Sequence, residues 1–341
     1  MRVAILAPIS WRVPPRQYGP WEQVVSLLTE GLVKRSIDVT LFASGDSVTK
    51  AKLVSVLPRP LNDDPSMNRA VAEFLHYTEV FSRADKFDLI HNHMNCYPLA
   101  FSPLIKTPIV TTLHGSALLE EYTHSLYLRF KDLPYVSISN TERSGLPQLN
   151  YIATVYNGID LKQFTFRPKP GQYLLFLGRI SAEKGTHLAI EVAKATSLPL
   201  KIAAIVPPEE QDYFKKEIEP QLSDSIEYIG PVGPKERDEV LGNALALLHL
   251  VTVPEPFGLV MVEAMASGTP VIGTSLGSVP EVVKDAETGF VVGNVDEAVG
   301  AVHKVGSLDR QKCRRWVEEN FTADKMVEGY LKVYEKVVRK Q

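Results

Sequence analysis

The sequence predicts an α/β protein of two domains, each built on a parallel sheet that is covered by helices on both faces. Short runs rich in Val, Ile, Leu and Phe alternate with longer stretches of helical periodicity along the whole chain. With 341 residues, the chain is long enough for two ordinary domains with separate cores. A polar segment rich in Pro and Gly, residues 166–172, interrupts the alternation, and we place the domain junction there.

The first predicted domain, residues 1–165, begins with an apolar strand and continues as an alternation of strands and helices. Its predicted strands are Arg2–Ala7, Asp38–Ala43, Asp88–His91, Ile109–Leu113, Tyr135–Ile138 and Ala153–Tyr156. Two longer segments, Trp21–Lys34 and Asn68–Ala84, have the spacing of apolar residues that is typical of amphipathic helices.

The second predicted domain, residues 166–320, repeats the alternation. Its predicted strands are Tyr173–Leu177, Leu200–Ala204, Ile226–Ile229, Ala244–Leu250, Val271–Gly273 and Phe290–Val292. Its predicted helices are Lys184–Ala195, Glu209–Ile218, Lys235–Gly242 and Gly258–Ser267. The remaining segment, 321–341, is predicted to form a terminal helix from Ala323 to Lys340, because Met326, Tyr330, Val333 and Val337 recur at helical spacing.

Composition and charge exclude several classes of protein. A formal net charge of −3 gives no electrostatic basis for nucleic-acid binding. No apolar run approaches the roughly 20 residues that a membrane helix needs, so we expect no transmembrane segment. The two cysteines, Cys96 and Cys313, lie far apart in the sequence, which favours a reducing, cytoplasmic location. A nicotinamide-dependent enzyme is disfavoured, because no Gly-x-Gly-x-x-Gly turn follows the first strand or the strand Tyr173–Leu177.

Two glutamates flank the start of the last helix predicted in the second domain. Glu255 precedes this helix and Glu263 lies within it. Backbone N–H groups of Phe257, Gly258 and Leu259 lie at the positive end of the helix dipole, which suits a phosphate. Carboxylates cannot bind phosphate, but they accept hydrogen bonds from sugar hydroxyls. The segment therefore predicts a ligand that carries both phosphates and sugars.

A second motif, Gly178-Arg179-Ile180-Ser181-Ala182-Glu183-Lys184-Gly185, follows a predicted strand and opens a predicted helix. Open α/β sheets bind ligands at the carboxyl ends of their strands. Arg179 offers a planar fork of donors and Lys184 a mobile point charge, and together they can hold a diphosphate. Taken alone, the same two residues could be surface cations beside a turn.

The two motifs together resemble those of the retaining glycosyltransferases of family 4, namely Glu-x7-Glu at Glu255 and Glu263, and Gly-Arg-x-x-x-x-Lys-Gly from Gly178. The resemblance implies the GT-B fold, in which two Rossmann-like domains have parallel sheets facing a central cleft. It implies an acceptor-binding first domain, a second domain that binds the nucleotide sugar, and a terminal helix that crosses back to the first domain. It also implies metal-independent transfer of a hexosyl group, with retention, from a nucleoside diphosphate sugar to an acceptor hydroxyl.

The resemblance assigns roles to single residues of the second domain. It places Arg179 and Lys184 at the donor diphosphate, and Glu255 at the hydroxyls of the transferred sugar. Glu263 would bind the ribose, and the amides of Phe257, Gly258 and Leu259 would bind the phosphate or the sugar. Tyr228 and Val232 follow a strand where backbone groups could meet the nucleotide base, although the same residues could simply turn the chain.

In the first domain, the resemblance singles out His114 and Gly19. His114 follows the strand Ile109–Leu113, in a context where the family has a histidine that contacts the donor sugar. Gly19 matches the first glycine of the family's Gly-Gly pair, but Pro20 replaces the second and has no N–H to offer a phosphate.

Two features of the first domain permit two interpretations each. The loop residues Trp11, Arg12, Arg16 and Trp21 could shape an acceptor pocket or merely pack against the first helix. His91 and His93 point to the same side of a strand, so a metal site is conceivable, but no third ligand is near in sequence. We prefer packing and hydrogen bonding for these histidines and expect no metal cofactor.

The donor nucleotide could be UDP, GDP or ADP, with UDP favoured by its frequency in the family. The acceptor, whether a sugar, a small molecule or a lipid-linked molecule, is left open, as is peripheral contact with a membrane. Two alternatives are a GT-B epimerase, which would convert the nucleotide sugar without an acceptor, and a non-catalytic subunit that binds sugar nucleotides.

Overall fold

The computed structural model describes residues 1–16, 19–64 and 66–339, and divides the chain into two compact units. Unit 1 comprises Met1–Gly158 together with the residues from Ala323 onward, and unit 2 comprises Ile159–Thr322. The chain thus passes into unit 2 at Ile159, whereas the sequence analysis placed the junction in residues 166–172. Tyr18, in the loop before the first helix, and Lys340 and Gln341, in the predicted terminal helix, lie outside the described residues.

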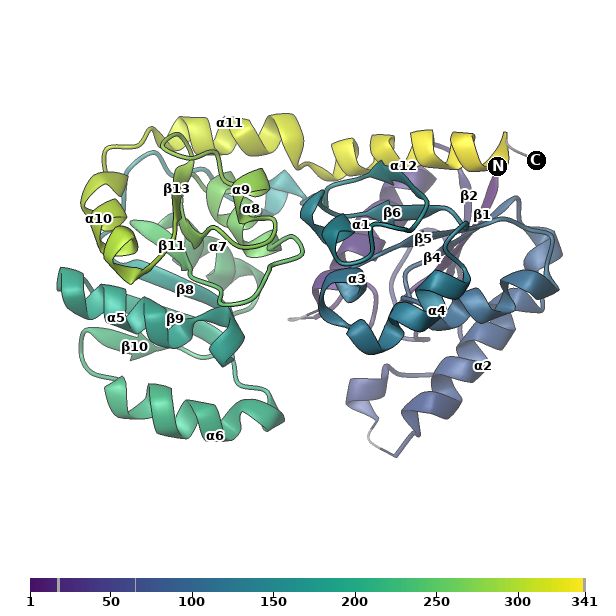
Figure 1. Cartoon of the computed structure of the whole chain (residues 1–341), viewed down its shortest axis with the longest axis horizontal. Helices are drawn as coiled ribbons and strands as arrows, with labels where there is room; N and C mark the ends of the chain where they lie inside the picture. The colour runs from purple at the N-terminus through teal and green to yellow at the C-terminus, as the bar shows by residue number, and fades with distance from the viewer. Residues whose placement is uncertain (17–18, 65, 340–341) are drawn as a thin grey trace. The chain divides into compact units, whose positions relative to one another are not determined.

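Unit 1 contains, in the part of it that is described, a seven-stranded parallel sheet of order β3-β2-β1-β4-β5-β6-β7. Its strands are β1 (Arg2–Leu6), β2 (Asp38–Phe42), β3 (Lys52–Val54), β4 (Leu89–Asn92), β5 (Ile109–Thr112), β6 (Tyr135–Ser137) and β7 (Tyr151–Thr154). Its helices are α1 (Pro20–Lys34), α2 (Arg69–Phe81), α3 (Ser116–Leu119), α4 (His124–Arg129) and α12 (Ala323–Val338). Figure 1 shows these elements from purple to blue-green, with α12 in yellow.

Several boundaries in unit 1 differ from those predicted. The strand predicted at Ala153–Tyr156 begins earlier, at Tyr151. Helix α2 stops at Phe81 rather than Ala84, because residues 84–86 form a separate 3₁₀ turn. Strand β3 was missed, since its three residues are only partly buried and lack an apolar run.

Helix α12 packs its apolar stripe against unit 1. Met326, Tyr330, Val333 and Val337, the residues predicted at helical spacing, are all buried. Burial of each such side chain contributes about 1.5–3 kcal/mol. The helix approaches α1 closely at Gly31, where an added Cβ would lie 2.5 Å from a methyl group of Val327.

Unit 2 contains a six-stranded parallel sheet of order β10-β9-β8-β11-β12-β13. Its strands are β8 (Leu174–Arg179), β9 (Leu200–Ile205), β10 (Ile226–Tyr228), β11 (Ala246–His249), β12 (Val271–Thr274) and β13 (Gly289–Val292). Its helices are α5 (Thr186–Thr196), α6 (Gln211–Tyr213), α7 (Pro234–Gly242), α8 (Leu259–Ala266), α9 (Val279–Val282), α10 (Val295–Val305) and α11 (Arg310–Asn320).

The helix predicted at Glu209–Ile218 is irregular in the structure. A 3₁₀ turn at residues 208–210 precedes the short α6, and a π-helical turn, Phe214–Ile218, follows it. The predicted helical stretch is thus helical over its whole length, but its hydrogen-bond pattern changes twice. Helices α10 and α11 were not predicted, although each begins at a side-chain cap, provided by Asn294 and Asp309.

In each sheet, successive strands are added first on one side of a central strand and then on the other, which creates a topological switch point. In unit 1, β2 and β3 extend from one side of β1, while β4 and the later strands extend from the other. In unit 2, β9 and β10 lie on one side of β8, and β11 to β13 lie on the other. Ligands of open α/β sheets bind outside the carboxyl ends of the strands at such switch points. The loops that follow β1 and β4, and those that follow β8 and β11, are therefore the places to look for a site.

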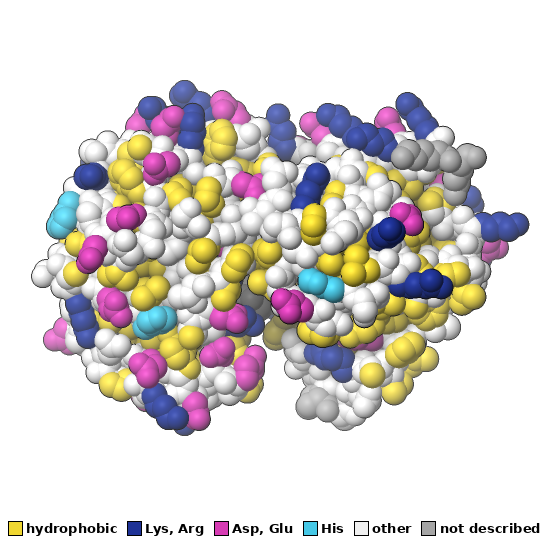
Figure 2. Space-filling view, viewed as in Figure 1, with side chains coloured by type: hydrophobic (Ala, Val, Ile, Leu, Met, Phe, Trp, Pro, Cys, Tyr) yellow, Lys and Arg dark blue, Asp and Glu magenta, His cyan; other side chains and the backbone are white. Residues whose placement is uncertain are grey.

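Exposed hydrophobic side chains are distributed unevenly between the two units. All the large hydrophobic side chains that are exposed among the described residues belong to unit 1. They are Met1, Val48, Val71, Phe74, Leu75, Tyr97, Leu104, Leu119, Tyr122 and Leu128. Figure 2 shows apolar side chains gathered on the right-hand part of the molecule, over α4 and its neighbours. Within the described chain, no helix combines the length and the apolar character required to cross a membrane.

Candidate active site

The two loops at the switch point of unit 2 are locked together by backbone contacts. Gly185 adopts a left-handed conformation at φ 70°, and an added Cβ there would lie only 1.8 Å from the carbonyl oxygen of Leu250. The backbone N–H of Thr252 donates to the carbonyl oxygen of Glu183 at 2.9 Å. Only glycine allows this close approach at position 185. The loop after β8 and the loop after β11 thus form one continuous surface at the switch point of unit 2.

Glu255 is the buried carboxylate of this surface. Its Oε2 accepts a hydrogen bond from Lys184 Nζ at 2.5 Å and lies 3.3 Å from Nε2 of His249. Burial would raise the pKa of Glu255, but His249 and Lys184 together outweigh burial and lower this pKa to about 2. Glu255 is therefore ionised at neutral pH, and both of these contacts use the same oxygen.

The backbone of Glu255 is fixed by the turn that precedes α9. Gly277 packs so closely that an added Cβ would lie 2.2 Å from the nitrogen and the carbonyl oxygen of Glu255. The backbone N–H of Ser278 donates to the same carbonyl oxygen at 2.8 Å. These contacts hold the backbone of the Glu255 loop in place.

Arg179 is the last residue of β8, at the carboxyl edge of the sheet. Its Nε is buried and has no hydrogen-bond partner in the part of the chain that the structure describes. Buried donors in native proteins nearly always have a partner. Arg179 lies at a switch point, five residues before Lys184 in the sequence. A guanidinium with an unused buried donor at such a place is suited to hold a phosphate or a carboxylate.

Helix α8 begins immediately after Gly258, which has a left-handed conformation at φ 74°. Glu263 lies in this helix, is buried, and forms an ion pair with Nη2 of Arg237 on α7 at 2.5 Å. Burial raises the pKa of Glu263, and Arg237 opposes that shift. Phe257 is buried just before the helix, and its ring packs edge-on against Phe321 with the ring centroids 6.0 Å apart.

The segment proposed to face a nucleotide base lies after β10. The hydroxyl of Tyr228 donates to the carbonyl oxygen of Ala204 at 3.0 Å, and its ring packs on Phe214 with the centroids 5.0 Å apart. Val232 is half-buried, and no atom lies within 4 Å of the Cβ position at Gly230 or Gly233. The hydroxyl of Tyr228 thus has a structural partner, while the two glycines border open space.

In unit 1, His114 follows β5 and belongs to a buried row of imidazoles. Its Nε2 lies 2.9 Å from Nδ1 of His93, and its ring stacks on Trp21 with the centroids 5.3 Å apart. Burial lowers the pKa of His114 to about 3 and that of His93 well below its usual value. Both rings are therefore neutral near pH 7. Nδ1 of His114 has no partner among the described residues.

His91 lies on β4 beneath this row, with its ring centroid 4.0 Å from that of His93. Its Nδ1 lies 2.7 Å from the hydroxyl of Tyr334, and its Nε2 lies 2.7 Å from Oγ1 of Thr112. The histidine pair is thus engaged in hydrogen bonds. In the described ranges, no three His, Cys, Asp or Glu side chains are grouped so that they could hold a metal ion.

Two buried glutamates shape the loops of unit 1, and neither was singled out from the sequence. Glu142 accepts hydrogen bonds from the backbone N–H groups of Gly115 and Ile138, and so fixes the turn after His114. Glu22 accepts one from the N–H of Trp11 at 3.2 Å, beside Gly19. Burial raises the pKa of each glutamate to about 7.

Comparisons with known proteins agree with this architecture. The model of Glycosyltransferase Family 4 matches residues 21–163, and that of Glycosyl transferases group 1 matches residues 159–322. The chain belongs to the family 4 glycosyltransferases. An uncharacterized glycosyltransferase of Methanocaldococcus jannaschii is 24% identical to it, over 95% of this chain and 97% of that protein.

Solved structures of similar fold confirm that this glycosyltransferase has the GT-B fold. Sucrose-phosphate synthase of Thermosynechococcus elongatus superposes with a TM-score of 0.82 at 18% identity and covers 100% of both chains. HepE of Anabaena, in complex with UDP and glucose, has a TM-score of 0.75 at 17% identity and covers 98% of this chain and 100% of its own.

The structure brings some of the predicted site residues of the glycosyltransferase into direct contact and adds partners to others. Lys184 and Glu255, 71 positions apart, form an ion pair at the switch point of unit 2. Arg237 and His249, the partners of Glu263 and Glu255, were not predicted. His249 ends a strand and could have been suspected, whereas Arg237 lies in a polar helix without a local motif.

Proposed function

We propose that this glycosyltransferase transfers a hexosyl group from a UDP-sugar to an acceptor hydroxyl, with retention of the anomeric configuration and without a metal. Unit 2 binds the donor and unit 1 binds the acceptor. The observation that carries the proposal is the ion pair between the half-buried Lys184 and the buried Glu255 at the switch point of unit 2. It presents a cation and an anion side by side, as a ligand with both phosphates and hydroxyls requires.

The polar atoms of unit 2 suit the parts of a nucleotide sugar. Arg179 and Lys184 are assigned to the diphosphate, where guanidinium and ammonium groups bind oxyanions. Glu255 is assigned to the sugar hydroxyls, because Lys184 and His249 both contact its Oε2 and no described residue bonds its Oε1. Glu263, which forms an ion pair with Arg237, is assigned to the ribose.

The proposed reaction forms a bond between the acceptor oxygen and the anomeric carbon and breaks the bond from that carbon to the diphosphate. Negative charge grows on the departing UDP, and the cations Arg179 and Lys184 stabilise it. The acceptor proton passes to the leaving phosphate. A neutral His114 would accept or donate a hydrogen bond at the sugar, because its buried ring does not carry a charge at neutral pH.

UDP is proposed as the nucleotide on two grounds. It is frequent in the family, and HepE, of similar fold, is in complex with UDP and glucose. At that low identity the likeness concerns the fold, so the nucleotide must be tested on this chain directly.

The test is thermal stabilisation by nucleoside diphosphates. A ligand at 100 times its Kd stabilises the folded state by about 2.7 kcal/mol. For a unit of this size we expect UDP to raise the Tm by about 5–10 °C. Arg179→Ala should abolish most of this shift, and Arg315→Ala, at an exposed position on α11, serves as the control. If neither UDP, GDP nor ADP moves the Tm at millimolar concentration, the donor site is wrongly assigned.

Stereochemistry provides the second arm of the test. The anomeric configuration of the product, or of the sugar released by slow donor hydrolysis, can be read by NMR before it equilibrates. We expect the configuration of the donor. An inverted product would refute retention while leaving the donor site intact.

A further inference from the structure

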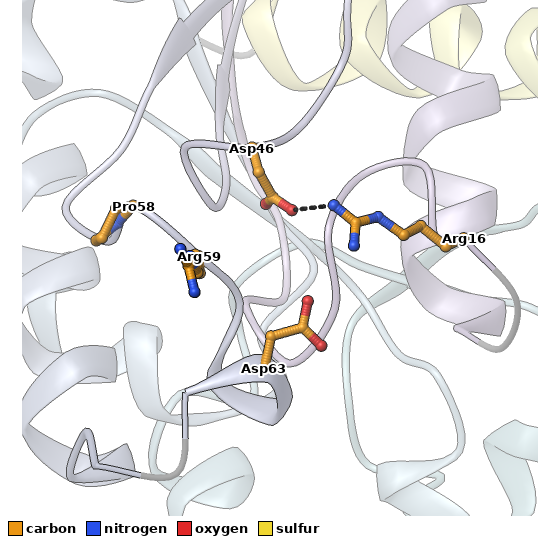
Figure 3. Close-up of a pocket in the computed structure, with 5 residues that line it drawn as sticks. All are labelled: Arg16, Asp46, Pro58, Arg59 and Asp63. Carbon is orange, nitrogen blue, oxygen red and sulfur yellow. Dashed lines mark ion pairs between the residues drawn. The ribbon is translucent and has the colours of Figure 1, made fainter.

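A hollow with a volume of about 610 Å³, lined by charged side chains and a proline, lies in unit 1, and its lining residues come from three separate loops (Figure 3). Arg16 belongs to the loop after β1, Asp46 to the loop after β2, and Pro58, Arg59 and Asp63 to the segment after β3. These strands are neighbours in the sheet, so the hollow lies at its carboxyl edge, where open α/β sheets bind ligands. Its volume falls within the range of about 300–1,000 Å³ that is usual for small-molecule sites.

The walls of the hollow are held in place by hydrogen bonds between the three loops. The loop after β1 is joined to the loop after β2 by the N–H of Val48, which donates to Val13 at 2.8 Å. The N–H of Gly45 donates to the carbonyl oxygen of Leu57 at 2.7 Å, and that of Leu61 donates to Ile9 at 2.9 Å. The backbone of the lining is therefore held in place before any ligand arrives, which lowers the entropic cost of binding.

The charges on these walls are used only in part by the protein. The Oδ1 of Asp46 accepts a hydrogen bond from the hydroxyl of Ser44 at 2.8 Å. Arg16 and Asp46 form a loose ion pair at 3.6 Å, beyond hydrogen-bond distance, and the Arg16 side chain is 66% exposed. Figure 3 shows Arg59 and Asp63 without a dashed line to either of them. Neither Arg59 nor Asp63 has an ion pair with any residue that the structure describes. Exposed pairs such as this contribute little to stability, so these groups are available to a ligand.

We infer that this hollow binds the acceptor, and that the acceptor is a polyol carrying an anionic group, such as a sugar monophosphate. The planar forks of Arg59 and Arg16 suit an oxyanion, and phosphate is the anion they hold best. Asp63 and Asp46 accept hydrogen bonds from hydroxyls. Pro58 gives the C–H face of a sugar ring an apolar contact. The inference rests on the proposed function, because it names the substrate that unit 1 would present to a donor held by unit 2.

The mixture of positive and negative side chains distinguishes this ligand class from purely anionic ligands and from neutral sugars. A purely anionic ligand would be repelled by the two aspartates, and a neutral sugar would leave the guanidinium of Arg59 unpaired. A ligand with one anionic group and several hydroxyls satisfies all four side chains. Of the interpretations open for the loop after β1, this assigns Arg16 to the acceptor pocket.

Calorimetry with defined probes tests the inference. The probes are glucose 6-phosphate, inositol 1-phosphate, ribose 5-phosphate, gluconate, glucose and inorganic phosphate, and the proteins are the wild type, Arg59→Ala, Asp63→Asn and Arg129→Ala. Arg129 is an exposed arginine of α4 in the same unit, so its substitution removes an equal charge away from the hollow. We expect at least one polyol phosphate to bind the wild type. Arg59→Ala should weaken this binding about 10- to 100-fold, as the loss of a charge-assisted hydrogen bond does.

Each outcome supports or overturns the inference. Weaker binding in Asp63→Asn for the polyol phosphates, but not for inorganic phosphate, supports the assignment of hydroxyls to Asp63. Binding of gluconate in preference to the phosphates identifies the anion as a carboxylate and supports the anionic class. Binding of no anionic probe, equal binding in Arg59→Ala, or tighter binding of glucose than of any anion overturns it. Titration of UDP in the same variants keeps the two proposals apart, because its affinity should be unchanged by Arg59→Ala whether or not the acceptor inference holds.

Discussion

Replacing Glu255 and Glu263 by Gln gives a matched pair of substitutions, because each replaces one buried carboxyl group of unit 2 and preserves the side-chain shape. The pKa of Glu255 falls from 4.5 to about 2 on folding, which corresponds to about 3 kcal/mol at about 1.4 kcal/mol per pH unit. Glu255→Gln should therefore lower the Tm at pH 7 by about 6–12 °C. Glu263 behaves oppositely, since burial raises its pKa, and Glu263→Gln should leave the Tm unchanged or slightly higher.

The pH dependence has a sign that follows from the same shifts. A carboxyl whose pKa is lowered by folding contributes stability above its unfolded pKa and loses it as the pH falls toward its folded value. The stability difference between the wild type and Glu255→Gln should be full above pH 4.5 and should vanish toward pH 2. If this difference is constant across that range, the ion pair with Lys184 is not its cause.

Binding then separates the roles of the two carboxylates. Each lost hydrogen bond to a charged acceptor is worth about 1.5–3 kcal/mol, or about 10- to 150-fold in affinity. By calorimetry, Glu255→Gln should weaken the UDP-sugar and spare UDP, whereas Glu263→Gln should weaken both. Glu287→Gln, at a partly exposed position of unit 2 where the carboxylate pairs with Lys284, serves as the control. Equal losses of UDP affinity in both variants, or none in either, would refute the assignment and leave the family and fold standing.

Three further outcomes are expected. Arg179→Ala should lower kcat about 10²- to 10³-fold with little change in Tm, because the guanidinium stabilises charge on the leaving group; wild-type turnover in this variant would contradict that role. Activity should survive dialysis against EDTA, and a requirement for added Mn²⁺ or Mg²⁺ would show that metal-independent transfer is wrong. The imidazole of His114 should show no protonation between pH 5 and 8 by ¹⁵N NMR, since burial lowers its pKa to about 3; a titration near pH 6.5 would exclude a buried, neutral ring.

The fold was predictable because buried parallel strands are continuous apolar runs, which stand out from the helices between them. β8 and β11 are of this kind, and both lie within two residues of their predicted positions. The elements that were missed lack that signal. β3 has only three partly buried residues, and α11 is strongly polar apart from a narrow buried stripe that includes Cys313 and Val317.

The family was predictable from two local motifs, but the electrostatic environment of their residues was not. A motif identifies residues that lie on a single loop, such as Lys184 after β8 or Glu255 after β11. The charge state of each depends on groups from other elements, and no sequence spacing encodes these pairings. Glu255 and Glu263 illustrate the consequence, because the same residue type has a lowered pKa beside Lys184 and His249 and a raised one beside Arg237.

The same reasoning explains why the sequence left the acceptor undetermined but indicated a nucleotide sugar as the donor. In the proposed function, donor recognition relies on charged groups that two loops concentrate at one switch point, and these loops contain the long motifs. The hollow of unit 1 draws single residues from three loops, at positions 16, 46 and 58–63, none of which forms a motif by itself. Only the parallel pairing of β1 with β2, and of β2 with β3, brings those loops to one edge of the sheet. A site assembled in this way can change its specificity through one loop at a time without disturbing the donor machinery, so the acceptor must be read from the structure of each chain.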